Sequence, residues 1–336
     1  MKTIFRLILV TIFYSLFSCQ KQKEVVVYCT VDQVFSEPVL QNFEKETGIQ
    51  VRPVFDTEET KSTGVMNRLI AEKNNPQCDV FWSGDPIRNN VLKNKKITTA
   101  YRSKSGAQIP EYFRDSSYHW TGFSARARVL IYNKKLLSKE AVPTSIFDFT
   151  KPEYKGKFAI ANPLFGTTTF HIAALFSVVG KQKAQEWLTG IKQNNVVLAS
   201  SNGDVKKRVI RGEIAFGLTD TDDAFEATHE TDDVAYLFPD QGIDEIGTLI
   251  MPNALSLIKN SPNPENARKL FEYLISKKTE AKLAESCAQM PLIKGTKTPL
   301  NIPSLDSIKP MKINYAKTAK LLESIQADLK KWVENQ

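Results

Sequence analysis

Short apolar segments alternate with amphipathic segments along most of this chain. Residues 25–29 are too continuously apolar to face water on one side, and residues 79–82 are a second short run of this kind. Between them, residues 35–47 place their apolar side chains on one helical stripe. Residues 49–55 are the remaining expected strand of this first unit, and residues 63–73 are its second expected helix. The alternation predicts parallel sheets with helices on both faces.

A second unit of the same kind begins near residue 157. Its expected strands cover residues 158–161, 196–199 and 214–218, and its expected helices cover residues 168–179, 184–192 and 205–211. The chain ends in helical patterns at residues 264–276, 279–286 and 314–335. A chain of 336 residues accommodates two lobes of this size.

Two longer apolar segments separate these units. Residues 126–132 and 248–258 read as long strands that cross between the lobes and form a two-strand hinge. We therefore predict a first lobe of residues 25–125 plus 255–336, and a second lobe of residues 126–254 that includes the hinge strands. A ligand would bind in the cleft between them, outside the carboxyl ends of the strands.

The first residues have the pattern of a secretory signal. Lys2 and Arg6 precede an apolar run at residues 7–17, which ends at Cys19 before a polar segment. This arrangement resembles a bacterial lipoprotein signal, so residues 1–18 would be removed, Cys19 lipidated, and residues 19–24 left as a linker. A plain signal peptide with an incidental cysteine is the alternative. Both kinds of signal predict a protein of the bacterial cell envelope, and a lipoprotein signal also predicts that lipid anchors it to the membrane.

Charge and cysteine content exclude several classes. Loss of Lys2 and Arg6 lowers the net charge from +8 to +6, and the basic residues are spread along the chain, unlike the dense stripe of a nucleic-acid binder. Cys29, Cys78 and Cys287 match no zinc spacing and are expected to be buried thiols.

Several segments, in order, resemble one family. Residues 27–28, 43–49 (FEKETGI) and 78–83 (CDVFWS) resemble the first lobe of periplasmic ferric-iron-binding proteins, members of the family-1 extracellular solute-binding proteins of ABC importers. Residues 148–157 (DFTKPEYKGK) resemble the entry of that family's second lobe, and residues 211–218 (RGEIAFGL) the strand before its ligand site. The resemblance implies a two-lobed class II periplasmic-binding-protein fold (Venus flytrap). It also implies a monomeric protein that binds a ligand for an importer permease in the periplasmic or extracytoplasmic space.

The metal-binding half of that family's site is altered here. Asp32 stands at the family's histidine, Gly84 at its glutamate with Asp85 next, and Asp222 and Asp223 at its two tyrosines. Carboxylate oxygens suit hard cations, so Asp32, Asp222 and Asp223 are candidate ligands of a ferric ion with a phosphate or carbonate partner. The departures favour a second class of cargo, an organic phosphate, phosphonate or other anion.

The anion-binding half of the site is better preserved. Residues 162–169 (NPLFGTTT) follow a strand and open a helix, and residues 200–203 (SSNG) repeat the pattern. Glycine allows close backbone approach, and a helix N-terminus attracts negative charge. In the resembling proteins these places hold the anion, while simple helix capping is the alternative. The candidate anion-binding residues are Gly166, Thr167, Thr168, Ser201 and Asn202.

Asp220, Asp222 and Asp223 directly follow a buried strand. Three carboxylates there are costly unless a metal ion, an ammonium group, sugar hydroxyls or protein groups satisfy them. The alternative is a solvated loop in which Asp220 or Asp222 caps a helix at Ala224.

The full set of expected ligand-binding residues gathers around strand ends. Aromatic side chains there would line the cleft or pack in the core. The chain carries no nucleophile elbow, zinc-protease motif, P-loop or dinucleotide-binding fingerprint, so we expect a binding protein and no enzyme. The expected residues are Tyr28, Thr30, Asp32, Trp82, Ser83, Gly84, Asp85, Gly166, Thr167, Thr168, Ser201, Asn202, Asp220, Asp222 and Asp223.

Overall fold

The structure, a computed structural model, describes residues 23–56 and 63–335. The expected signal peptide and Cys19 lie outside the described residues. Within the described ranges, no helix is both long and apolar enough to cross a membrane.

The first unit has the predicted order. In the sheet, β1 (Glu24–Cys29) lies between β2 (Gln50–Phe55) and β3 (Val80–Ser83), parallel to both. The connections are α2 (Gln33–Thr47) and α3 (Thr63–Ala71). As predicted, Gly48 ends α2, and its φ of 68° is the left-handed conformation that glycine adopts most easily. A further helix, α4 (Pro86–Asn94), and the short β4 (Thr98–Thr99) were not predicted.

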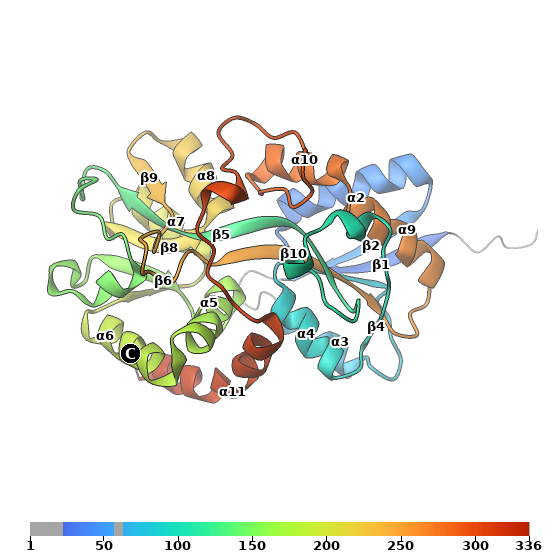
Figure 1. The fold of residues 1–336 in the computed structure, drawn as a ribbon, viewed down its shortest axis with the longest axis horizontal. Coiled ribbons are helices and arrows are strands. Elements are labelled where there is room, and N and C mark those ends of the chain that lie inside the picture. The colour runs from blue at the N-terminus through green and yellow to red at the C-terminus, as the bar shows by residue number, and fades with distance from the viewer. Residues whose placement is uncertain (1–22, 57–62, 336) are drawn as a thin grey trace, which may run out of the picture.

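Two long buried strands cross between the halves of the molecule (Figure 1). They are β5 (Thr121–Asn133) and β10 (Ile250–Ile258), which pair antiparallel to each other. All residues of both are buried. Phe123 faces Asn253 and Ala125 faces Pro252, so Ser124, with φ of 40°, is the extra residue of a β-bulge.

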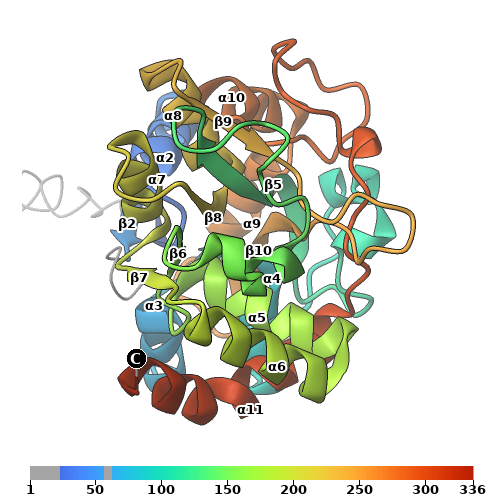
Figure 2. The same cartoon turned by 90° about the vertical axis from the view of Figure 1, so that its left-hand side faces the viewer.

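The second unit continues the sheet from β5. The strand order is β2-β1-β3-β10-β5-β8-β6-β7, in which β9 pairs with β5 and β4 with β10 off this path. Helices α5 and α6 lie on one side of this half, and α7 and α8 on the other (Figure 2). The elements are β6 (Phe158–Ala161), α5 (Gly166–Val178), α6 (Gly180–Gln193), β7 (Val197–Ala199), α7 (Asn202–Ile210), β8 (Phe216–Asp220), α8 (Thr221–Glu230) and β9 (Val234–Leu237).

The C-terminal helices connect back to the first half. Helices α9 (Pro264–Leu274) and α10 (Lys277–Cys287) share one hydrophobic core with β1 and α2, through Leu270, Leu283 and Phe43. The last helix, α11 (Tyr315–Glu334), packs against both α4 and α5 and so touches both halves (Figure 1). The exact lobe boundaries stay a prediction. Short 3-10 helices cover Ser105–Gln108, Glu111–Phe113, Ile146–Thr150, Pro152–Tyr154 and Leu305–Ser307.

The three cysteines of the described chain are buried, as predicted. The thiols of Cys78 and Cys287 are free, and each donates a hydrogen bond to a nearby backbone carbonyl. Burial raises the pKa of both thiols above the ordinary value, so they are poor nucleophiles and poor metal ligands.

Candidate functional site

A cavity that is partly open to solvent lies at the carboxyl ends of β6 and β8 and faces the ends of β1 and β3. This is where ligands bind in parallel α/β sheets. Most residues expected from the sequence line it, and Arg126, Asn162 and Phe165 join them. The expected residues that line it are Thr30, Asp32, Gly84, Gly166, Thr167, Thr168, Ser201, Asn202, Asp220, Asp222 and Asp223.

Four expected residues lie elsewhere. Tyr28 is buried in the core, where its hydroxyl donates to the Glu72 carboxylate at 3.0 Å. Trp82 is fully buried and packs against Phe123. Both sit on strands whose two faces are covered, so core packing, the alternative weighed for the aromatic residues, describes them.

Ser83 and Asp85 are also buried and serve local structure. The Ser83 hydroxyl accepts from the Asp85 amide at 3.3 Å, while the Asp85 carboxylate caps α4 and pairs with Arg88. Ser83 and Asp85, like Tyr28 and Trp82, are therefore not part of the candidate site.

Three helices begin at the cavity. The α5 helix starts at Gly166, whose φ is 59°, and the preceding Phe165 provides no side-chain cap. At α7, the Ser201 hydroxyl accepts from the Asp204 amide at 3.1 Å, so capping is confirmed for this residue. The α8 helix starts at Thr221. The first-turn amides of a helix lack intrahelical acceptors and carry partial positive charge, so the starts of α5 and α7 suit an anion, whereas the first turn of α8 carries Asp222 and Asp223.

The expected acidic loop has a different local structure. Asp220 is the last residue of β8, and Asp222 and Asp223 belong to the first turn of α8. Asp220 occupies the N-cap position without making a side-chain capping bond. Its carboxylate is 2% exposed and points instead toward β5 and α5, so the loop-with-capping alternative is wrong for Asp220.

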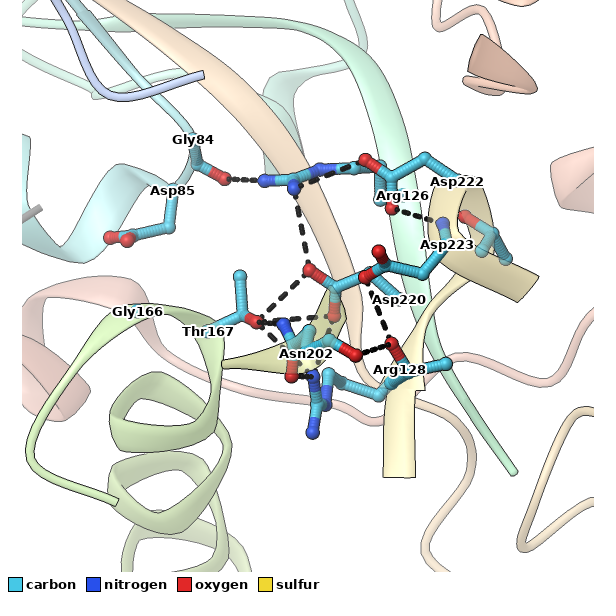
Figure 3. A network of polar contacts seen from close by, with 12 residues as sticks. Gly84, Asp85, Arg126, Arg128, Gly166, Thr167, Asn202, Asp220, Asp222 and Asp223 are labelled. Carbon is cyan, nitrogen blue, oxygen red and sulfur yellow. Dashed lines mark hydrogen bonds and ion pairs between the residues drawn. The ribbon is translucent and has the colours of Figure 1, made fainter. Parts of the chain in front are cut away.

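Two buried arginines of β5 pair with the carboxylates of Asp220 and Asp222 (Figure 3). Arg128 Nη1 lies 2.7 Å from Asp220 Oδ1, while Arg126 Nη1 lies 3.3 Å from Asp220 Oδ2 and 3.4 Å from Asp222 Oδ2. Buried carboxylates require such partners because desolvation is otherwise too costly. Residues 126–132 were predicted only as a hinge strand, without a role for either arginine. Two arginines separated by one residue in an apolar strand are a usable signal, because they point to the same face.

Arg128 also joins the first turns of α5 and α7 (Figure 3). It donates to Thr167 Oγ1 at 3.1 Å and to Asn202 Oδ1 at 3.0 Å, and more weakly to Thr168 Oγ1 at 3.4 Å. Asn202 Nδ2 in turn donates to Thr167 Oγ1 at 2.8 Å. These side chains bond to one another, so the backbone amides of both first turns are the candidate donors to an anion.

Arg126 also explains the glycine at position 84. Its Nη2 donates to the Gly84 carbonyl at 2.8 Å, and the Gly84 amide donates to Thr30 Oγ1 at 3.0 Å. A Cβ on Gly84 would lie 2.8 Å from that Nη2. Space that a larger side chain would need is therefore filled by the guanidinium.

The electrostatics of the cavity remain biased toward negative charge near Asp223. Burial, reinforced by Asp222 and Asp220, raises the pKa of Asp223 to about 8. The nearest cation, Lys206 Nζ, lies 3.8 Å away and is engaged more closely with Glu226. Burial alone would lower the pKa of Arg126, but Asp222 and Asp220 more than offset it and raise that pKa. This end of the cavity suits a cationic or hydrogen-bond-donating group.

The candidate metal ligands do not form a ready metal centre. Asp32, Asp222 and Asp223 all line the cavity. Yet throughout residues 23–56 and 63–335, no three His, Cys, Asp or Glu side chains are grouped so as to hold a metal ion. His171 is buried in α5, and burial together with Arg128 lowers its pKa to about 3.

Known proteins share this fold and part of this sequence. Residues 39–303 match the family model described as bacterial extracellular solute-binding protein. Iron uptake protein A1 of Synechocystis sp. is 27% identical over 293 residues, covering 84% of this chain and 78% of that protein. A putative 2-aminoethylphosphonate-binding periplasmic protein of Salmonella typhimurium is 26% identical over 298 residues, covering 86% and 84%. Iron-bound HitA of Pseudomonas aeruginosa is 21% identical and superposes with a TM-score of 0.83. The superposition covers 91% of this chain and 99% of the HitA chain. That likeness confirms the predicted two-lobed fold.

Proposed function

Because the chain belongs to the bacterial extracellular solute-binding proteins, we propose that it captures a small ligand outside the cytoplasm and delivers it to the permease of an ABC importer. The ligand binds in the cavity between a first lobe of residues 25–125 plus 255–336 and a second lobe of residues 126–254. The two crossing strands, β5 and β10, are the hinge. The protein binds its ligand without converting it, and it acts as a monomer.

The ligand that the geometry supports best is a small organic anion. Its phosphate, phosphonate or carboxylate group lies on the first turns of α5 and α7, against the amides from Gly166–Thr168 and Asn202. One observation carries this choice: Arg126 and Arg128 already supply the cations for Asp220 and Asp222, at 2.7–3.4 Å. Hydroxyl or ammonium groups at the other end of the ligand meet Asp32, Asp222 and Asp223, which all line the cavity. The relative named for 2-aminoethylphosphonate supports a ligand with such opposite ends.

A ferric ion with a phosphate or carbonate partner is the second candidate. It is favoured by the relative named as an iron uptake protein and by the hard oxygens of Asp32, Asp222 and Asp223 along the cavity. Arg126 weighs against it, because a fixed positive charge 3.4 Å from Asp222 repels a trivalent cation bound to that carboxylate.

Calorimetry on metal-free protein separates the two candidates. Ferric ion plus phosphate is titrated in one series, and sugar phosphates and aminophosphonates in another, into wild type and Asp222→Asn. Asp233→Asn is the control, because Asp233 pairs with Lys135 at an exposed site outside the cavity. Submicromolar binding of an organic anion to metal-free protein, weakened in Asp222→Asn alone, supports the first candidate. Tight ferric binding that Asp222→Asn abolishes, without organic binding, overturns it. Recovery of the ligand chemically unchanged checks that no turnover occurs.

We also propose that lipid on Cys19 anchors the mature protein to the membrane after residues 1–18 are removed. The pattern of Lys2, Arg6, an apolar run and Cys19 supports this. Cys19→Ala is expected to block processing or release the protein from the membrane fraction. Unchanged processing and fractionation in that variant would show that the anchor is not there.

A further inference from the structure

Arg88 is a buried cation that lies outside the cavity yet contacts its wall. It sits on α4, is 1% exposed, and pairs with the Asp85 carboxylate. Its Nη2 donates to the carbonyl of Gly166 at 3.2 Å. Gly166 is the first residue of α5 and lines the cavity. One guanidinium therefore connects the end of β3, in the first unit, to the start of α5 at the cavity.

The shape of the side chain matters for this connection. A guanidinium is a rigid fork that can serve two acceptors at once, whereas a lysine ammonium acts as a point charge. Arg88 Nη1 pairs with the Asp85 carboxylate, and Arg88 Nη2 donates to the Gly166 carbonyl. In the described part of the chain, Arg88 Nε is buried and has no hydrogen-bond partner. A buried guanidinium with one unpaired N–H is stable only while its other hydrogen bonds are intact, so the side chain is confined to one position.

The held carbonyl belongs to the peptide unit that carries the Thr167 amide. A trans peptide is planar, so fixing the direction of the Gly166 carbonyl also fixes the Thr167 N–H, which points the opposite way. Gly166 has φ of 59°. A glycine in this conformation restrains the orientation of the peptide little on its own. A charged donor on the carbonyl also polarises the peptide and strengthens its N–H as a donor.

We propose that Arg88 is a positioning residue for ligand binding: through the Gly166 carbonyl it orients the first-turn amides of α5 toward the anion. This inference rests on the proposed anion site. It assigns a binding role to a residue that touches no ligand. Loss of the Gly166 contact misaligns the Thr167 amide while leaving the cavity lining unchanged in composition.

Arg88→Lys tests the inference, because lysine retains the charge beside Asp85 but its single nitrogen cannot occupy the positions of both Nη1 and Nη2. Lys93→Met is the matched control: it removes the other ion pair of α4, Lys93 Nζ to Asp115 Oδ1 at 2.6 Å, which has no link to α5. The probes are inorganic phosphate and 2-aminoethylphosphonate, titrated by calorimetry. The Thr167 amide resonance of ligand-free protein is followed by NMR. Arg88→Lys is expected to weaken probe binding about tenfold and to shift this resonance, and Lys93→Met to do neither.

The outcomes separate this inference from the proposed ligand class. Unchanged probe affinity in Arg88→Lys overturns the positioning role even where wild-type binding upholds the anion site. A shifted Thr167 resonance in a protein that binds neither probe supports the orientation by Arg88 and overturns the proposed ligand class. If Arg88→Lys does not fold, the double variant Asp85→Asn, Arg88→Met removes both charges, and Asn retains the helix cap. Wild-type probe affinity in that variant overturns the inference.

Discussion

Arg126 donates from Nη2 to the carbonyl of Gly84 at 2.8 Å, and a Cβ on Gly84 would lie 2.8 Å from the same nitrogen. The Arg126 side chain thus extends from the crossing strand β5 to the backbone at the end of β3, although β10 lies between these two strands in the sheet. The other terminal nitrogen of Arg126 faces Asp220 and Asp222. Any side chain at position 84 therefore moves the cation that neutralises the cavity carboxylates.

Gly84→Ala is expected to displace Arg126 and weaken ligand binding at least tenfold, because the carboxylates lose their aligned partner. Overpacking should also lower the free energy of unfolding by about 1–3 kcal/mol. Calorimetry and urea denaturation measure the two effects. Gly190→Ala, on α6 and outside the cavity lining, is the control, because its Cβ would lie 2.6 Å from Thr150 Cγ2. Equal losses of affinity in both variants would contradict a specific role for Gly84.

Thr167 and Thr169 offer a matched pair on α5. The Thr167 hydroxyl donates to Asp220 at 3.0 Å and accepts from Arg128 and Asn202. Thr169 is fully buried and its Oγ1 has no partner in the described structure. Thr167→Val should cost about 1.5–3 kcal/mol in ligand affinity, since a network with charged groups is broken. Thr169→Val should leave affinity unchanged and stability equal or higher. Similar affinities for both variants would contradict the role of the network.

The fold was predictable where burial produces a continuous apolar run. β6 covers the residues expected for it, and β1 begins only one residue earlier. Helix starts were placed late at α5 and α7, because their first turns contain Gly, Thr and Asn and show no apolar period. The α4 helix was missed because its sequence, PIRNNVLKN, buries Arg88, Asn89 and Asn90 on what looks like a polar surface.

The candidate site was predictable where it follows strand ends, at Gly166, Asn202 and Asp220. What could not be predicted was which groups neutralise the acidic cluster. Arg126 and Asp220 are 94 residues apart and meet only because β5 and β8 pair antiparallel, with Arg128 facing Asp220 in the register. Local patterns do not encode that register, so the buried arginines were assigned to the hinge alone.

Arg128→Met is expected to lower the free energy of unfolding by about 3–5 kcal/mol, because Asp220 loses its shortest ion pair while both positions stay buried. Asp220→Asn added to Arg128→Met should restore part of this loss, since no uncompensated carboxylate remains. Urea denaturation of the single and double variants measures the coupling. Additive losses in the double variant would mean that the two charges do not stabilise each other in the folded protein.

The pKa of Asp223 predicts a pH dependence of stability. The folded value of about 8 lies above the ordinary value of 3.8 that applies to the unfolded chain, because of burial and the carboxylates of Asp222 and Asp220. Between these pH values the folded protein holds a proton that the unfolded chain has released. The contribution of Asp223 to stability is therefore fully present below about pH 4 and is lost as the pH rises through 8.

Asp223→Asn removes this titration but retains a polar side chain for the Thr219 hydroxyl, which donates to Asp223 at 2.9 Å in the wild type. The free energy of unfolding of the variant minus that of wild type should therefore increase from pH 4 to pH 8, by at most about 1.4 kcal/mol per pH unit, and then level off. Urea denaturation at a series of pH values measures this difference. Asp233→Asn, at an exposed ion pair with Lys135, should show no such rise. A difference between Asp223→Asn and wild type that stays constant over this range would mean that Asp223 is ionised throughout, and that its neighbours compensate the charge fully.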